Sequence, residues 1–442
     1  MPPPRLDGSG WIGHSSRYQS GTHDDAHGLD AVRDTRAVIA YPQYGDGRST
    51  AARVRSGGAR RPRFEQTLAV VSHVPHWPQD GAQPLAYEPY VREMEVWAQL
   101  FARVNVCAPV AEWPVRGNQA PYSAENIRWV PVRYSFGPGA RLHLRRLRQL
   151  AVLTRTLVPL LRSSDLVLLR SPTPVSMVAR PMATALGART ITKWAGPLEG
   201  VTGEEPLTRV ERFLLRRAHD PALVYGRADR PHLISFIPAF MSDAELEEAG
   251  KLAMRRSWKP PWRLLAVGRL SPEKGYDLAL RGLAELRRVR GDLTWHFTLV
   301  GDGMEAPGLR DLADQLGISD RVTFAGALSF ADVRQRYGQA HLVLMPGVKE
   351  GWGKVVAEAW AHAAIPVAAA AVLIPELIDG TGAGVTFEPT PEALAGALAG
   401  LLSNPDEMRA MAGRGPRQCE GLSLETFATR LERVLVESCG IR

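Results

Sequence analysis

Residues 342–369 read LVLMPGVKEGWGKVVAEAWAHAAIPVAA, and this stretch decides the fold class. An apolar run over 342–345 is followed by a loop with three glycines, a helical pattern over 354–363 and a second apolar run from 366. Short, nearly continuous apolar runs are typical of strands that are buried on both faces of a parallel sheet. The stretch therefore predicts one strand–helix–strand unit of an α/β protein.

The same alternation extends from this unit in both directions. The expected further strands are 67–72, 104–109, 166–170, 189–192, 222–225, 263–267, 295–300 and 322–324. The expected further helices are 90–101, 141–162, 174–186, 276–290, 307–316, 330–338, 391–402 and 424–438. Residues 242–261 are charged and end in Lys-Pro-Pro, a composition typical of a linker.

Two doubly wound, Rossmann-like domains that face each other across a crevice are therefore expected. We place them at 64–250 and 262–423. Residues 424–442 form a C-terminal helix and tail, which we expect to pack back toward the N-terminal domain. Residues 1–63 are rich in Gly, Ser, Asp and Arg and show no apolar period, which predicts a disordered extension.

Composition excludes several classes of protein. Of 442 residues, 45% are hydrophobic and 23% are charged, which is the balance of a globular protein. Cys107, Cys419 and Cys439 lie far apart, so neither a disulfide framework nor a zinc site is indicated, and a reducing, cytoplasmic compartment fits best. The longest apolar stretch is interrupted by Glu358 and other polar residues, so no transmembrane helix is expected. The net charge of +8 favours phosphates or anionic lipids as partners.

The strongest chemical signal is a pair of acids around the start of the 354–363 helix. Glu350 and Glu358 are separated by seven residues. Gly351 and Gly353 allow the backbone to approach a ligand, and the free N–H groups of the first helical turn favour an anion such as a diphosphate. Glu358 lies about one turn further on, where it could accept hydrogen bonds from the vicinal hydroxyls of a ribose. The alternative is an ordinary turn with solvent-facing acids.

A second cluster follows the 263–267 strand and reads GRLSPEKG over 268–275. Arg269 and Lys274 bracket a tight turn, so both cations could meet the same diphosphate. As isolated residues they would more often be surface charges. The glycine turn after 295–300 and the segment 322–328 could sandwich a base through backbone groups.

Taken in order, these motifs resemble the nucleotide-sugar half of the family-4-type retaining glycosyltransferases of the GT-B fold. The resemblance covers about 262–438. It implies catalytic roles for Arg269, Lys274 and Glu350, with the two cations on the donor diphosphate and Glu350 facing the donor sugar. It implies donor-binding roles for Gly268, Gly301, Leu328, Gly351, Trp352, Gly353, Lys354 and Glu358. The family uses such side chains in place of a divalent metal, so we expect no metal and no cofactor besides the nucleoside-diphosphate sugar as co-substrate.

The N-terminal half resembles the family less closely. We expect its contacts with substrate from His73, Gly81, Lys193 and Trp194. Only Gly81 stands where the family's loop usually has a pair of glycines. By position, Trp194 falls where many relatives carry a histidine near the reacting sugar, and Lys193 or His73 would have to replace that group.

An arginine-rich helix is expected over 141–162, with apolar residues at helical spacing. Such a helix can rest on anionic lipid headgroups. The alternative is a core-facing helix with a solvated basic face.

The sequence thus predicts a retaining glycosyltransferase that moves a sugar from a nucleoside-diphosphate sugar to a hydroxyl of a glycan or lipid-linked acceptor. We expect it to act in polysaccharide or glycolipid synthesis, in the cytoplasm or at the inner face of the membrane, and not on nucleic acid. Two alternatives stay open. One is an isomerase of the nucleotide-sugar 2-epimerase type, for which no acid/base set can be placed. The other is a non-catalytic sugar-nucleotide or glycan-binding protein, suggested by Trp194.

Overall fold

A computed structural model gives the structure of the protein. It describes residues 62–115, 117–133, 143–196, 198–200, 204–226, 228–236, 240–349, 352–371 and 373–442. Of the extension expected over residues 1–63, all but residues 62 and 63 lie outside this range, as do Glu350 and Gly351.

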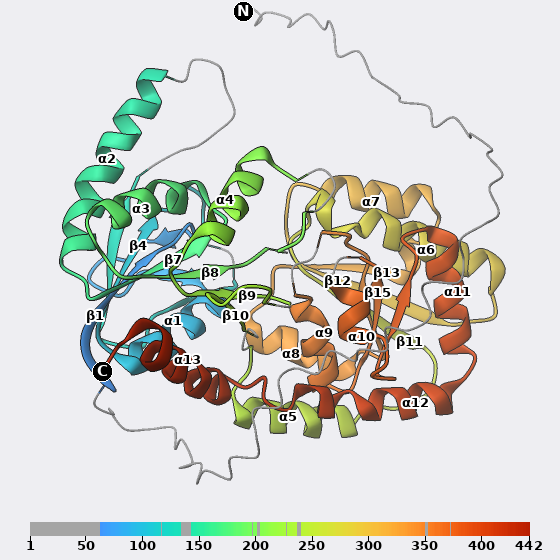
Figure 1. Ribbon diagram of the computed structural model, residues 1–442. Helices are drawn as coiled ribbons and strands as arrows, with labels where there is room; N and C mark the ends of the chain where they lie inside the picture. The colour runs from blue at the N-terminus through green and yellow to red at the C-terminus, as the bar shows by residue number, and fades with distance from the viewer. Residues whose placement is uncertain are drawn as a thin grey trace, which may run out of the picture. The chain divides into compact units, whose positions relative to one another are not determined.

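The first half of the described chain forms a seven-stranded parallel sheet in the order β10-β9-β8-β7-β1-β4-β6 (Figure 1). Its strands are β1 Phe64–Val71, β4 Phe101–Pro109, β6 Ile127–Val132, β7 Leu166–Ser171, β8 Thr190–Trp194, β9 Ala222–Val224 and β10 Leu233–Ser235. The chain starts in the middle of the sheet at β1 and adds strands first on one side and then on the other. The strand order therefore reverses beside β1, and ligands of open α/β sheets commonly bind at such a point.

Four helices accompany this sheet: α1 Glu88–Leu100, α2 His143–Arg162, α3 Pro174–Ala185 and α4 Pro206–Arg217. A small antiparallel sheet of β2 His76–Trp77, β3 Leu85–Tyr87 and β5 Gln119–Pro121 occupies the region where we expected only a loop after β1. These strands have two or three residues each, which is too short to show an alternating pattern in the sequence.

The second half forms a six-stranded parallel sheet in the order β13-β12-β11-β14-β15-β16. Its strands are β11 Trp262–Val267, β12 Trp295–Val300, β13 Val322–Gly326, β14 Leu342–Met345, β15 Ile365–Ala369 and β16 Val385–Phe387. Its helices are α6 Tyr276–Val289, α7 Ala306–Gln315, α8 Phe330–Gln339, α9 Lys354–Ala361, α10 Ile374–Ile378, α11 Pro391–Leu402 and α12 Pro405–Arg414, with short 3-10 turns η1 Pro272–Lys274, η2 Ser319–Arg321 and η3 Pro416–Cys419. Two parallel sheets with crossover helices confirm the predicted α/β class.

The segment between the sheets differs from the prediction. Residues 242–261 were expected to be a linker, and they contain helix α5 Asp243–Met254. The helix is stabilised by a reciprocal cap in which Ser242 accepts from the backbone of Glu245, and the Glu245 side chain accepts from the backbone of Ser242. The charged composition of this segment therefore reflects a capped surface helix.

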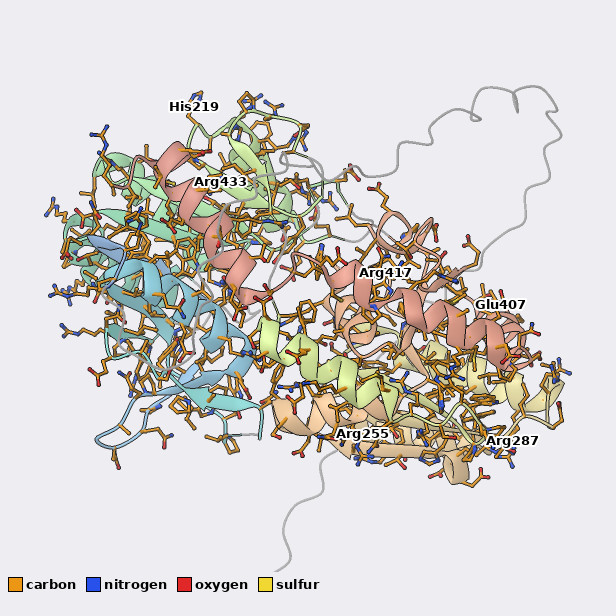
Figure 2. All side chains as sticks on the ribbon, turned by 90° about the horizontal axis from the view of Figure 1, so that it is seen from below. His219, Arg255, Arg287, Glu407, Arg417 and Arg433 are labelled. Carbon is orange, nitrogen blue, oxygen red and sulfur yellow. The ribbon has the colours of Figure 1, made fainter. Side chains whose placement is uncertain are left out.

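The chain ends on the first sheet. Helix α13 Leu424–Cys439 packs against α1, and Phe427, Leu431 and Leu435 are buried in the core of the first half. The Phe427 ring lies 5.0 Å from the ring of Phe236, measured between centroids. Figure 2 shows Arg433 on α13 beside the elements of the first half, whereas Glu407 on α12 lies with the second half.

Candidate functional site

The loops at the carboxyl ends of β11 and β12 interlock through glycines. A Cβ atom on Gly301 would lie 1.8 Å from the carbonyl oxygen of Gly268, and one on Gly303 would lie 2.1 Å from that of Leu270. Neither clash could be relieved without moving backbone. The sequence led us to expect that backbone groups after β12 could contact a base. In the structure the glycines let the two loops approach each other closely.

The loop after β11 also meets the loop after β14. Gly275 has a φ of +64°, and a Cβ atom there would lie 2.8 Å from the carbonyl oxygen of Pro346. Three loops of the second sheet are therefore joined at one edge, and Arg269 and Lys274 lie in the first of them. The Arg269 side chain is 74% exposed and lies 3.4 Å from Glu273. A weakly held, exposed guanidinium of this kind can turn toward an anion.

Helix α9 brings Lys354 and Glu358 to the same edge. It begins after Gly353, whose φ of +67° is in the left-handed region, and no described side chain caps its first turn. Glu358 is half-buried and accepts a hydrogen bond of 2.8 Å from the Tyr337 hydroxyl. Burial raises the pKa of Glu358 although the charge of Lys354 opposes the shift. The Tyr337 hydroxyl therefore orients the carboxylate, and the effect of burial on its pKa is larger than that of the nearby positive charge.

Charges of the second half also shift the pKa values of two residues of the first half, His73 and Tyr87. His73 follows β1, and desolvation together with the charges of Arg170 and Arg269 lowers its pKa to about 4. Tyr87 ends β3, and desolvation together with the charge of Glu358 raises its pKa to about 12. The pKa of His73 thus responds to Arg269 and that of Tyr87 to Glu358, so each lies near a predicted residue of the second half.

A buried ion cluster lies behind His73 in the first half. Glu93 of α1 contacts Arg170 at 2.6 Å and Lys193 at 2.7 Å. Burial alone would raise the pKa of Glu93, but the two cations hold it at about 2. Burial lowers the pKa of Lys193 to about 8 despite its carboxylate partner. Lys193 is therefore committed to an internal ion pair in this structure.

Several other predicted contacts of the first half lie elsewhere. Trp194 is fully buried in a core cluster with Leu215 and Val224, so its indole does not face a ligand. His76, which shares the loop with His73, is fully buried and bonds to the Tyr122 hydroxyl at 2.6 Å. Gly81 has a φ of +68° and lies in the turn between β2 and β3. It shapes a hairpin, because a left-handed turn position strains any residue with a Cβ.

The residues predicted to bind the donor lie in different environments. Gly268, Gly301 and Gly353 lie at the joined loop edge, as described above. The Trp352 side chain is 8% exposed and packs in the core with Val356 and Ile374, which leaves only its backbone for a ligand. Leu328 packs at the border of another core cluster. Glu350 and Gly351 lie outside the described residues.

Sequence reasoning missed Tyr87, Glu93 and Tyr337. Each belongs to an element far along the chain from its partner, and none is part of a motif. The only local signal was the exposed aromatic side chain of Tyr87 at the end of a strand, which is 47% exposed.

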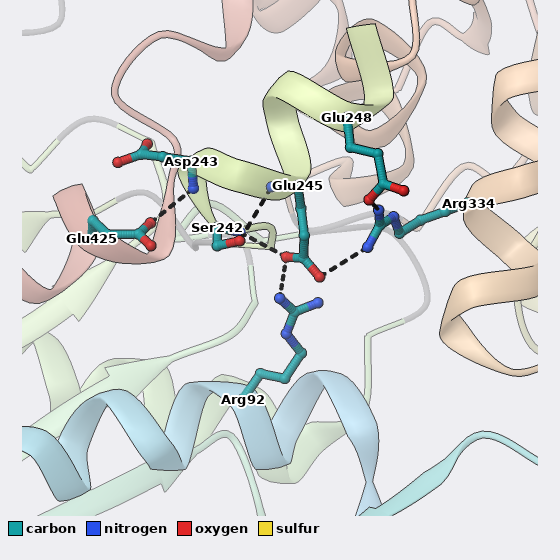
Figure 3. A network of polar contacts seen from close by, with 7 residues as sticks. All are labelled: Arg92, Ser242, Asp243, Glu245, Glu248, Arg334 and Glu425. Atoms are coloured by element: carbon teal, nitrogen blue, oxygen red, sulfur yellow. Dashed lines mark hydrogen bonds and ion pairs between the residues drawn. The ribbon is translucent and has the colours of Figure 1, made fainter. Parts of the chain in front are cut away.

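A polar network joins elements of both halves near this region (Figure 3). Glu245 of α5 accepts from Arg92 of α1 and, at 3.0 Å, from Arg334 of α8. The Arg92 guanidinium also lies 4.7 Å from the centre of the Phe330 ring. Although burial opposes the shift, these hydrogen bonds lower the pKa of Glu245. Helix α5 therefore connects the first helix of one half to a helix of the other.

The described part of the chain has neither a cluster of metal ligands nor a helix that could span a membrane. Within that part of the chain, no three His, Cys, Asp or Glu side chains lie close enough together to hold a metal ion. No described helix has both the length and the apolar character needed to cross a bilayer.

Comparison with known proteins bears on the second half most directly. Residues 254–418 match the model of a family described as glycosyl transferases group 1. The D-inositol 3-phosphate glycosyltransferase of Segniliparus rotundus is 29% identical over 245 residues, which cover 53% of this chain and 54% of that protein. The chain thus matches about half the length of this curated relative.

Two solved structures share the fold over most of the chain. Sucrose-phosphate synthase from Thermosynechococcus elongatus has a TM-score of 0.63 at 16% identity and covers 85% of this chain and 100% of its own. Anabaena Alr3699/HepE in complex with UDP-glucose has a TM-score of 0.63 at 17% identity and covers 84% and 99%. At these identities the likeness shows a common fold, the two-domain GT-B arrangement of glycosyltransferases.

Proposed function

We propose that this protein, whose residues 254–418 match the model of the glycosyl transferases of group 1, transfers a sugar from a nucleoside-diphosphate sugar to a hydroxyl acceptor with retention of anomeric configuration. The observation that carries the proposal is that Arg269 and Lys274 lie in the joined loops of the second sheet, while Lys354 and Glu358 lie in α9, where the Tyr337 hydroxyl holds the Glu358 carboxylate at 2.8 Å. Cations and an oriented carboxylate on neighbouring elements suit a ligand that has both phosphates and hydroxyls.

In the proposed reaction the bond between the anomeric carbon and the diphosphate breaks, and the acceptor oxygen forms the new bond on the same face of the sugar. Arg269, Lys274 and the first turn of α9 stabilise the charge that develops on the departing diphosphate. Glu358 holds the ribose hydroxyls. These groups would do the work that a divalent metal does in other transferases.

We also propose the setting of the reaction. Anabaena Alr3699/HepE holds UDP-glucose, which supports a nucleoside-diphosphate hexose as donor. The Segniliparus relative is named for inositol 3-phosphate, so a phosphorylated polyol belongs among the acceptors to be tested beside glycans and lipid-linked sugars. The arginines of α2 would hold the protein at an anionic membrane surface in polysaccharide or glycolipid synthesis.

Saturation-transfer NMR with UDP-, GDP- and ADP-sugars, followed by product analysis with and without acceptors, tests the proposal. We expect binding of at least one donor and a new glycoside only when acceptor is present. Conversion of the donor alone would indicate an epimerase, and binding without any product would indicate a binding protein. If none of these donors bound, the proposal would fail.

A further inference from the structure

Helix α4 is an amphipathic helix whose apolar side faces outward. Leu207, Val210, Phe213 and Leu214 are between 40% and 51% exposed. They recur at helical spacing and form one stripe along the helix. A helix of a globular protein normally turns such a stripe toward the core.

The protein-facing side of α4 carries one apolar residue, Leu215, which packs in a core cluster, and two buried polar residues. Glu211 is 1% exposed, and its carboxylate accepts from the Thr173 backbone N–H at 2.9 Å and from the Ser176 hydroxyl at 2.5 Å. These two residues form the N-terminal cap of α3. Arg212 is also buried and pairs with Glu204. These contacts and Leu215 fix the orientation of α4 and leave the apolar stripe exposed.

Within α4 the exposed charges are positive, and the exposed Glu205 lies just before the helix. Helix α4 carries four arginines and one acid, and that acid is the buried Glu211. Arg209 and Arg217 are exposed, and the Arg217 guanidinium lies 4.1 Å from the centre of the Phe213 ring. His219, just after the helix, projects from the surface in Figure 2. An apolar stripe with an aromatic ring and flanking arginines matches an anionic lipid surface, where the apolar groups enter the acyl boundary and the arginines meet the headgroups.

We infer that the exposed side of α4 inserts into the interface of an anionic lipid bilayer. This inference deepens the proposed function, on which it rests for the membrane setting, and it moves the apolar anchor from α2 to α4. In Figure 1, α2, α3 and α4 lie on the same side of the seven-stranded sheet. Helices α2 and α4 could therefore contact the same bilayer surface. In the described part of α2, Leu150 and Val152 are exposed as well.

Vesicle co-sedimentation without any sugar nucleotide tests the inference. Wild-type protein should bind vesicles of phosphatidylcholine with phosphatidylglycerol and not phosphatidylcholine alone. Reversing two charges, Arg209→Glu with Arg217→Glu, should lower the partition coefficient about thirtyfold or more, since each basic residue contributes about fivefold. Val210→Ser with Phe213→Ser should lower it about tenfold or more, because apolar area no longer enters the interface.

The matched control is Met304→Ser, which removes an apolar side chain that is 81% exposed in the other half of the molecule. It should bind vesicles as the wild type does. Because the substituted side chains of α4 are exposed, the variants should retain wild-type circular dichroism and donor binding in solution. Retained donor binding with lost vesicle binding keeps the tests of membrane docking and of glycosyl transfer separate.

Insertion itself can be read from an environment-sensitive dye on Phe213→Cys, compared with Met304→Cys. We expect a blue shift with anionic vesicles at position 213 only. The inference is overturned if the α4 variants bind as wild type while changes in α2 abolish binding. It is also overturned if dye at both positions responds equally, or if the stripe proves to join two copies of the chain in sedimentation velocity.

Discussion

Glu93 neutralises two buried cations, so its replacement tests the cluster behind His73. Glu93→Gln leaves Arg170 and Lys193 buried without a carboxylate, and we expect the free energy of unfolding to fall by about 3–5 kcal/mol. Denaturation in urea measures the change. Adding Lys193→Met to Glu93→Gln should recover part of the loss, because one uncompensated charge is removed. Full wild-type stability of the single variant would show that the pair contributes nothing.

The same residue predicts a pH dependence. The pKa of Glu93 is about 2 in the folded protein, against an ordinary value of 4.5. Its contribution is therefore complete above about pH 4.5 and is lost as the pH falls toward 2. The difference in stability between wild type and Glu93→Gln should shrink over this range. A difference that stayed constant down to pH 2 would contradict the assignment.

Glu358 tests the donor site. Glu358→Gln keeps the shape but removes the charge that meets the ribose hydroxyls, and we expect donor affinity to fall about five- to thirtyfold, or roughly 1–2 kcal/mol. Titration calorimetry with the free nucleoside diphosphate should show the same loss, because the contact is to ribose. The control is Glu392→Gln, an exposed acid in the first turn of α11. Unchanged nucleotide affinity in Glu358→Gln would refute the ribose role.

At the scale of elements, the Glu245 carboxylate of α5 contacts both α1 and α8, and Glu248 of the same helix makes a second contact with Arg334 of α8. Glu245→Gln should weaken its contacts with both Arg92 and Arg334 and lower the free energy of unfolding by about 2 kcal/mol. Amide hydrogen exchange in α5 should become faster. Glu247→Gln is a control on the same helix, because Glu247 and its partner Lys251 are both exposed. It should change neither quantity. Equal effects of the two variants would show that the network does not hold α5.

Helix α2 carries the basic face that the sequence predicted for membrane docking. The side chains of Arg145, Arg146 and Arg148 lie outside the described ones, so their contribution rests on charge alone. Reversing all three to glutamate should abolish sedimentation with anionic vesicles, and added salt should release the wild type. Reversal of three exposed arginines of the other half, Arg281, Arg336 and Arg409, is the control for net charge. Indifference to the α2 reversals would make α2 an ordinary packed helix.

At the scale of the whole molecule, the charges that we propose for the donor all come from the second half of the chain. If Arg269 and Lys274 replace a divalent metal, protein treated with EDTA should bind the nucleotide sugar and form product as well as untreated protein. Loss of binding on chelation, restored by added magnesium, would contradict metal independence. The same assay with Arg269→Ala should show a loss that magnesium does not restore.

The sequence by itself determined the fold class, because short apolar runs that alternate with helical patterns predict a parallel sheet with crossover helices. It also determined the order of the donor-side motifs around Arg269, Lys274 and Glu358, because each is a short turn after a strand. It did not show that Asp243–Met254 is a helix, since charged composition looks alike in a linker and in a capped surface helix.

Only the tertiary structure decided which side chains meet. Tyr337 of α8 donates a hydrogen bond to Glu358 of α9, and no local pattern in the sequence records this contact between two helices. The same holds for Lys193, which the sequence offered as a ligand and the structure pairs with Glu93. It holds for α4 as well, because the direction in which an amphipathic helix faces depends on its neighbours. Which side chains are buried and which of them form contacts depends on how the whole chain packs. A local stretch of sequence does not determine it, because all the contacts of the fold contribute together.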